Sequence, residues 1–176
     1  MIKMDLRYPI GPFEFTEKIQ LEMIEQWISD IEVLPTLLKQ EIEGLSEKQL
    51  DTPYREDGWT VRQVVHHLAD SHLNGYLRVR LALTEDEPTI LPYDENKWAE
   101  LPDATGAPVS LSIHLLTSIH ARWIYLIKSI SAETLKRTYR NPEMGILTLA
   151  QNLELYAWHG KHHVAHITTL KKRMNW

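Results

Sequence analysis

Four histidines fall within eight residues near the C-terminal end of this 176-residue chain: His159, His162, His163 and His166. If the segment is helical, residues four apart share a face, with Cβ atoms roughly 5–6 Å apart. His159 then pairs with His163, and His162 pairs with His166. Two imidazoles placed in this way can bind one divalent ion, as helical His pairs do in several zinc enzymes. The tract therefore predicts a metal site. The alternative is that it binds metal only adventitiously, as His-rich tracts often do.

The position of each histidine on the helix separates the two pairs. At 100° per residue, one continuous apolar stripe is predicted at positions 152, 155, 156, 159, 163, 166, 167 and 170. His159 and His163 lie in this stripe, His162 lies toward its edge, and His166 is a candidate for a contact outside the ligand set. The residue after His159 is Gly160. The glutamate of the H-E-x-x-H motif is therefore missing, which disfavours a metalloprotease.

A third imidazole is available from an earlier predicted helix. His67 lies on its apolar side, whereas His66 lies off that side. Because packed helix axes are 8–10 Å apart, side chains of two helices can meet at one ion. Asp70, one turn from His67, could accept the second N–H of an imidazole, or it could be an ordinary solvated charge. Asp70 and His166 are the candidate catalytic residues, chosen by spacing only.

Composition limits the chemistry that the chain can do. It has no cysteine and nine histidines, so any metal must be bound by His, Asp or Glu. Thiolate zinc fingers, iron–sulfur clusters, disulfides and a cysteine nucleophile are excluded. The formal net charge of −5 argues against a broad nucleic-acid-binding face. Since no apolar run approaches a membrane span and no signal peptide is evident, we expect no membrane partner and a cytoplasmic location.

Apolar residues recurring every three or four positions predict four long helices and no sheet. The expected ranges are 16–43, with Pro35 kinking or interrupting the helix, then 60–84, 110–129 and 148–173. Capping boxes are predicted at Thr60–Gln63 and Thr148–Gln151. Residues 1–15 form an extended N-terminal arm, and residues 139–145 form a loop. Trp59, Trp98, Trp123 and Trp158 are expected to be packing residues.

The connection over residues 85–109 is unusually long for a compact domain. It contains four prolines, with room for a short helical piece around residues 94–100. A helix of some 24 residues is about 36 Å long. A connection of this length can run back along it, so that the next helix starts parallel to the last one. We expect a single all-α domain over residues 1–176, a four-helix bundle with a long crossover between its second and third helices.

Two segments carry a resemblance to a known family. They are Gly58–Ser71, GWTVRQVVHHLADS, and Tyr156–Ile167, YAWHGKHHVAHI. The sequence resembles the DinB/YfiT-like family of metal-binding helix bundles, and in particular its YfiT branch of metal-dependent hydrolases; residues 8–11 and 50–55 are also similar. The resemblance implies an up-down-down-up bundle, a homodimer, and metal ligation by His67, His159 and His163.

Three neutral imidazoles would leave a divalent ion with its full charge and an open position for water or a small-molecule substrate, which is typical of catalytic zinc. The predicted function is therefore hydrolysis, with Zn²⁺ as the first candidate and Ni²⁺ as the second. Some relatives resemble thiol S-transferases, so activation of a low-molecular-weight thiol such as bacillithiol is an alternative. A second alternative is a non-enzymatic dimeric binding bundle.

Overall fold

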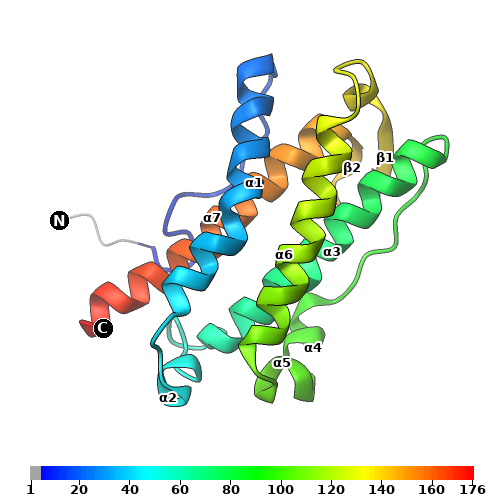
Figure 1. Ribbon diagram of the computed structural model, residues 1–176. Coiled ribbons are helices and arrows are strands. Elements are labelled where there is room, and N and C mark those ends of the chain that lie inside the picture. The colour runs from blue at the N-terminus through cyan, green and yellow to red at the C-terminus, as the bar shows by residue number, and fades with distance from the viewer. Residues whose placement is uncertain (1–4) are drawn as a thin grey trace.

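The computed structural model describes residues 5–176, and four long helices dominate it (Figure 1). They are α1 (Leu21–Ile42), α3 (Val61–Thr84), α6 (Val109–Lys128) and α7 (Leu149–Met174). The shorter elements are α2 (Glu47–Leu50), α4 (Glu95–Ala99), α5 (Pro102–Gly106), the 3₁₀ helix η1 (Thr134–Lys136), β1 (Thr138–Asn141) and β2 (Gly145–Thr148). The predicted four-helix bundle is confirmed.

The long helices follow an up-down-down-up course. In Figure 1, α3 and α6 both run upward, whereas α1 and α7 run downward. Helix α7 packs against α1 and α3, and α6 packs against the same two helices. The crossover between α3 and α6 returns along the bundle and carries α4 and α5. Because the crossover is long enough to make this return, α6 runs parallel to α3. The region predicted to hold one short helical piece thus contains two.

The first helix begins later than its apolar pattern predicts. Helix α1 starts at Leu21 rather than at position 16. Thr16 is hydrogen-bonded to α7 instead, because its backbone N–H and its hydroxyl both donate to Oε1 of Glu154. Phe13 packs on the ring of Trp158, which ties the arm to the bundle. Residues 1–4 of the predicted arm lie outside the described residues.

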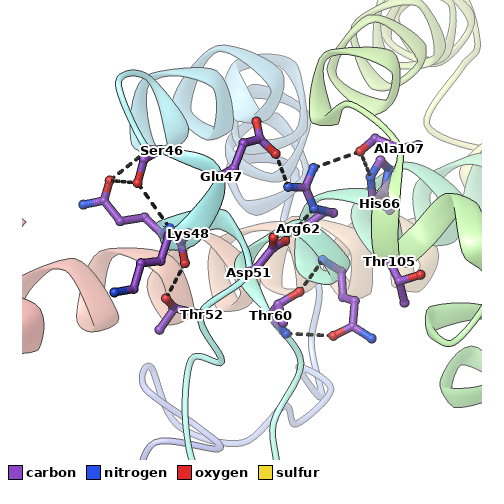
Figure 2. Close-up of polar contacts among 12 residues, drawn as sticks. Ser46, Glu47, Lys48, Asp51, Thr52, Thr60, Arg62, His66, Thr105 and Ala107 are labelled. Carbon is purple, nitrogen blue, oxygen red and sulfur yellow. Dashed lines mark hydrogen bonds and ion pairs between the residues drawn. The ribbon is translucent and has the colours of Figure 1, made fainter.

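The starts of α3 and α7 are set locally, as predicted. Thr60 and Thr148 each accept a hydrogen bond from the third backbone N–H of their helix, and the following Gln63 and Gln151 side chains reach back to the cap. The buried Arg62 guanidinium joins α2 to α3, because it donates to Asp51 and Glu47 (Figure 2). These contacts place the N-terminal half of α3, which carries His67.

The sequence prediction for His66 is wrong. The helical pattern places it off the apolar side of its helix, but its side chain is buried, with 6% of its surface exposed. Its Nδ1 lies 2.7 Å from Oγ of Ser112. Its Nε2 lies 3.1 Å from the carbonyl oxygen of Ala107 (Figure 2). Helical periodicity along α3 alone could not show that the start of α6 covers this face.

The predicted loop at residues 139–145 is also wrong, because most of it belongs to a two-stranded antiparallel hairpin. Tyr139 pairs with Leu147, and both side chains enter the core. Asn141 closes the turn by accepting hydrogen bonds from the backbone N–H groups of Glu143 and Met144. Strands of four residues are too short for a period of two to stand out in the sequence.

Two apolar clusters fill the bundle and meet at a layer of histidines. On α3, one cluster ends at Ala69 and the other begins at Tyr76, with His72 between them. On α7, residues 159–166 lie between Ala157 of one cluster and Ile167 of the other. The histidine tract is therefore at mid-height in the bundle. Over residues 5–176, none of the helices has the length and apolar character needed to cross a membrane.

Candidate metal centre

The structure brings the three predicted ligands together. His67 comes from α3, and His159 and His163 come from α7; each offers a ring nitrogen, and these nitrogens lie within 4.8 Å of one another. The Nε2 atoms of His67 and His159 are 3.1 Å apart. Two nitrogens bound to one zinc ion at 2.0–2.1 Å with tetrahedral angles would be about 3.3 Å apart. The donor set therefore fits a small divalent ion.

The hydrogen bond between His163 and His166 has a defined direction. Nε2 of His166 lies 3.2 Å from the carbonyl oxygen of Arg7, and a carbonyl can only accept, so His166 donates through Nε2. Its Nδ1 is then an acceptor, 3.3 Å from Nδ1 of His163. His163 donates through Nδ1, which leaves its Nε2 with a free lone pair. His166 thus lies outside the candidate ligand set and orients a member of it.

A second histidine triad competes for the same role. His162, His163 and His166 also offer nitrogens within 4.8 Å of one another. Two of these three, however, already use ring nitrogens in the contact just described. The ring of His162 stacks on Trp158 with centroids 4.4 Å apart. The hydrogen-bond pattern therefore favours the triad of His67, His159 and His163.

Burial keeps the candidate ligands neutral. It lowers the pKa of His67 to about 4, with a smaller contribution from His162. Burial, followed by repulsion from the neighbouring imidazoles, holds the pKa values of His159 and His163 well below the usual 6.5. A metal can bind only to unprotonated imidazole. At pH 7 these rings are ready to bind without first losing a proton to solvent.

Asp70 does not make the orienting contact that was considered for it. Among residues 5–176, its carboxylate has no hydrogen bond to an imidazole, and it is not one of the described residues that line the cavity next to the three histidines. Burial and the nearby Asp103 raise its pKa to about 6. The second nitrogen of His159 is instead 3.2 Å from Nε2 of His72.

The three histidines lie in the wall of a cavity of about 470 Å³. Several other residues of the wall were not predicted as site residues from the sequence, namely Arg55, Arg78, Tyr93 and Tyr156. Arg78 could have been found, because the eleven residues from His67 are close to three helical turns and place both on one face. Tyr93 comes from the crossover, and no periodic signal marks it. Trp59 and Trp158, predicted to be packing residues, also line this cavity.

These features together define a helix-bundle protein with a candidate metal centre made of imidazoles at mid-height. A family model described as the DinB superfamily matches residues 30–167, and the chain belongs to that superfamily. The family resemblance carried by the two histidine segments is confirmed.

Named relatives are similar in sequence to this protein over nearly the whole chain. A protein of Bacillus cereus (strain 03BB102) is 57% identical over 172 residues, which cover 98% of this chain and 99% of the relative; its name is "Putative metal-dependent hydrolase". A protein of Bacillus thuringiensis subsp. konkukian (strain 97-27) with the same kind of name matches equally well.

A solved structure of YfiT from Bacillus subtilis superposes with a TM-score of 0.94 at 49% identity, covering 97% of this chain and 98% of that one. That protein is described as "a probable metal-dependent hydrolase with an unusual four-helix bundle topology". The names of these relatives and the histidine groups of this chain both indicate a divalent metal.

Proposed function

We propose that this protein is a metal-dependent hydrolase with one divalent ion held by His67, His159 and His163. The observation that carries the proposal is the convergence of three neutral imidazoles from two helices at the wall of a cavity. Three neutral protein ligands leave a position for water or substrate, whereas structural zinc is closed by four. Zinc is the first candidate, and nickel is the second, since imidazole suits both.

When bound, such an ion would supply Lewis-acid polarisation of a carbonyl and a lowered pKa for a bound water. The chain supplies the surroundings. The ring of Trp59 packs against His67, with centroids 4.6 Å apart, and limits the approach of bulk water from that side. Arg78 donates to the hydroxyl of Tyr156 at 3.1 Å and presents a positive charge in the cavity. It could orient a carbonyl or carboxylate group of a substrate.

Asp70 and His166 remain the candidate proton acceptors for the reaction. The contacts of the two residues differ. His166 already uses both ring nitrogens, toward His163 and Arg7, which suits a positioning role better than proton transfer. The raised pKa of Asp70, about 6, is near the value that suits a general base at neutral pH, although its carboxylate is not among the described residues that line the cavity.

Thiol S-transfer is the second candidate function. The chain contains no cysteine, so an external thiol would meet no competing protein thiol at the ion. An ion held by these histidines would favour the more nucleophilic thiolate form of such a thiol. The substrate of such a reaction would be a small thiol together with an electrophile.

The test uses untagged protein, because a histidine tag would itself bind metal. Elemental analysis should find close to one zinc or nickel ion per chain in the wild type and little in His67→Ala and His163→Ala. His114→Ala, which changes an exposed histidine of α6, is the matched control and should keep its metal. Metal absent from the wild type would overturn both enzymatic functions and favour a binding bundle.

Activity then separates the two reactions. Ester and amide substrates should be hydrolysed by the metal-loaded wild type and not by His67→Ala. Turnover that occurs only when a small thiol and an electrophile are added would reject the hydrolase and support the transferase.

A further inference from the structure

A chain of buried imidazoles crosses the bundle core away from the cavity. Nδ1 of His159 lies 3.2 Å from Nε2 of His72, and Nδ1 of His72 lies 2.9 Å from Nε2 of His120. Nδ1 of His120 lies 2.6 Å from the carbonyl oxygen of Ile31. His72 is fully buried, and His120 is 2% exposed. Contacts from α7, α3, α6 and α1 thus form one continuous line through all four long helices.

The end of the chain on α1 is an acceptor that the helix itself cannot use. In an α-helix, the carbonyl of residue i accepts from the N–H of residue i+4. The residue four positions after Ile31 is Pro35, which lies inside α1 and has no N–H. The Ile31 carbonyl is therefore left free of its helical partner, and His120 contacts it at 2.6 Å. The helix continues through Pro35 to Ile42.

This free carbonyl sets the direction of every hydrogen bond in the chain. A carbonyl can only accept, so His120 must donate through Nδ1. A neutral imidazole has one donor and one acceptor, which makes Nε2 of His120 an acceptor for Nδ1–H of His72. By the same rule, Nε2 of His72 accepts from Nδ1–H of His159. The tautomer of His159 is then determined: its Nε2 has no proton and faces Nε2 of His67.

We propose that His72 and His120 are positioning residues that hold His159 in the tautomer able to bind metal through Nε2, and that Pro35 enables this by freeing the Ile31 carbonyl. The inference rests on the proposed metal centre. A purely structural role would not require this direction, because buried polar groups need only be paired. Outer-shell contacts to a ligating histidine commonly fix its tautomer and ring orientation.

The first test reads the tautomer directly in metal-free, untagged protein. Long-range ¹H–¹⁵N correlation of labelled histidines distinguishes Nδ1–H from Nε2–H rings. The expected result for His120, His72 and His159 in the wild type is Nδ1–H. Finding His159 protonated at Nε2 instead would overturn the proposal, whether or not the protein binds metal.

The second test measures Zn²⁺ affinity by competition with a chromophoric chelator. His72→Phe keeps an aromatic ring, slightly larger than imidazole, but removes the acceptor, and affinity should fall about 10- to 100-fold. His72→Gln retains an amide oxygen that can accept from His159, so its affinity should stay close to that of the wild type. His114→Phe, on the exposed face of α6, is the control. A folded His72→Phe variant with unchanged affinity would contradict the proposal.

The outcomes also separate this inference from the proposed function. If the wild type binds no zinc, the metal centre fails, while the tautomer measurement still decides the direction of the imidazole chain. If the wild type binds zinc and hydrolyses no substrate, the positioning role is still tested by the affinity series.

Discussion

The histidines of this protein differ in what their second nitrogen contacts. For His159 and His163, the nitrogen away from the candidate ion contacts another imidazole rather than a carboxylate. Each of these contacts leads to a backbone carbonyl, of Ile31 or of Arg7. Neutral outer-shell partners leave the charge of a bound ion uncompensated. An ion held in this way would remain a strong Lewis acid.

Asp70 offers a test at the residue scale. Its raised pKa, about 6, means that its charged form is disfavoured by burial and by Asp103. Asp70→Asn should therefore raise the free energy of unfolding at pH 7, by about 1 kcal/mol. Zn²⁺ affinity should not change, because no hydrogen bond joins the carboxylate to a ligand in the described part of the chain.

If Asp70 is the proton acceptor, hydrolysis by Asp70→Asn should fall about 100-fold or more. Urea unfolding and steady-state rates measure the two effects separately. His114→Ala, which changes an exposed histidine of α6, is the control and should keep full activity. Hydrolysis by Asp70→Asn at nearly the wild-type rate would exclude Asp70 as the base.

At the scale of elements, close helix packing forms the cavity wall. Gly75 of α3 faces the ring of Tyr156 on α7, and a Cβ atom at this position would lie 2.5 Å from Cζ of that ring. Glycine is unfavourable inside a helix, and at this position it is required by the close approach of two helices. Tyr156 in turn lines the cavity and accepts a hydrogen bond from Arg78.

Gly75→Ala should therefore destabilise the protein, although alanine favours a helix by about 1 kcal/mol over glycine. We expect a net loss of about 1–3 kcal/mol from the crowded contact, measured by urea unfolding. Gly106→Ala is the matched control, because no atom of residues 5–176 lies within 4 Å of the added Cβ there. Equal stability of Gly75→Ala and the wild type would show that the helices can separate at little cost.

The whole molecule should lose stability in mild acid. Burial lowers the pKa values of His67, His120, His162 and His166 to about 4, against about 6.5 for unfolded histidine. Between these two values, the unfolded chain binds more protons than the folded protein. The free energy of unfolding of the metal-free protein should therefore decrease as the pH falls from about 6.5 toward 4.

Each additional proton bound by the unfolded chain corresponds to about 1.4 kcal/mol per pH unit. Asp70, with its pKa raised to about 6, opposes this trend by one proton over part of the range. Urea midpoints at pH 7, 6 and 5 measure the slope, and return to pH 7 checks reversibility. A flat profile would mean that the imidazoles are accessible to protons in the folded state.

Much of this molecule follows from local patterns in the chain. Apolar periodicity predicts the four long helices, and the boxes at Thr60 and Thr148 place two helix starts correctly. Spacing of four residues brings His159 and His163 to one face. These predictions succeed because helical geometry and capping depend on neighbours within a few residues.

Contacts between distant segments were decided only by the tertiary structure. The burial of His66 depends on residues 107–112, the late start of α1 depends on Glu154, and Tyr93 reaches the cavity from the crossover. The same is true of the partnership between Pro35 and His120. Sequence shows a proline within a helix, but only the packing of α6 against α1 shows which side chain takes the carbonyl that it frees. The physical reason is that a hydrogen bond between helices depends on their relative placement, which no local spacing encodes.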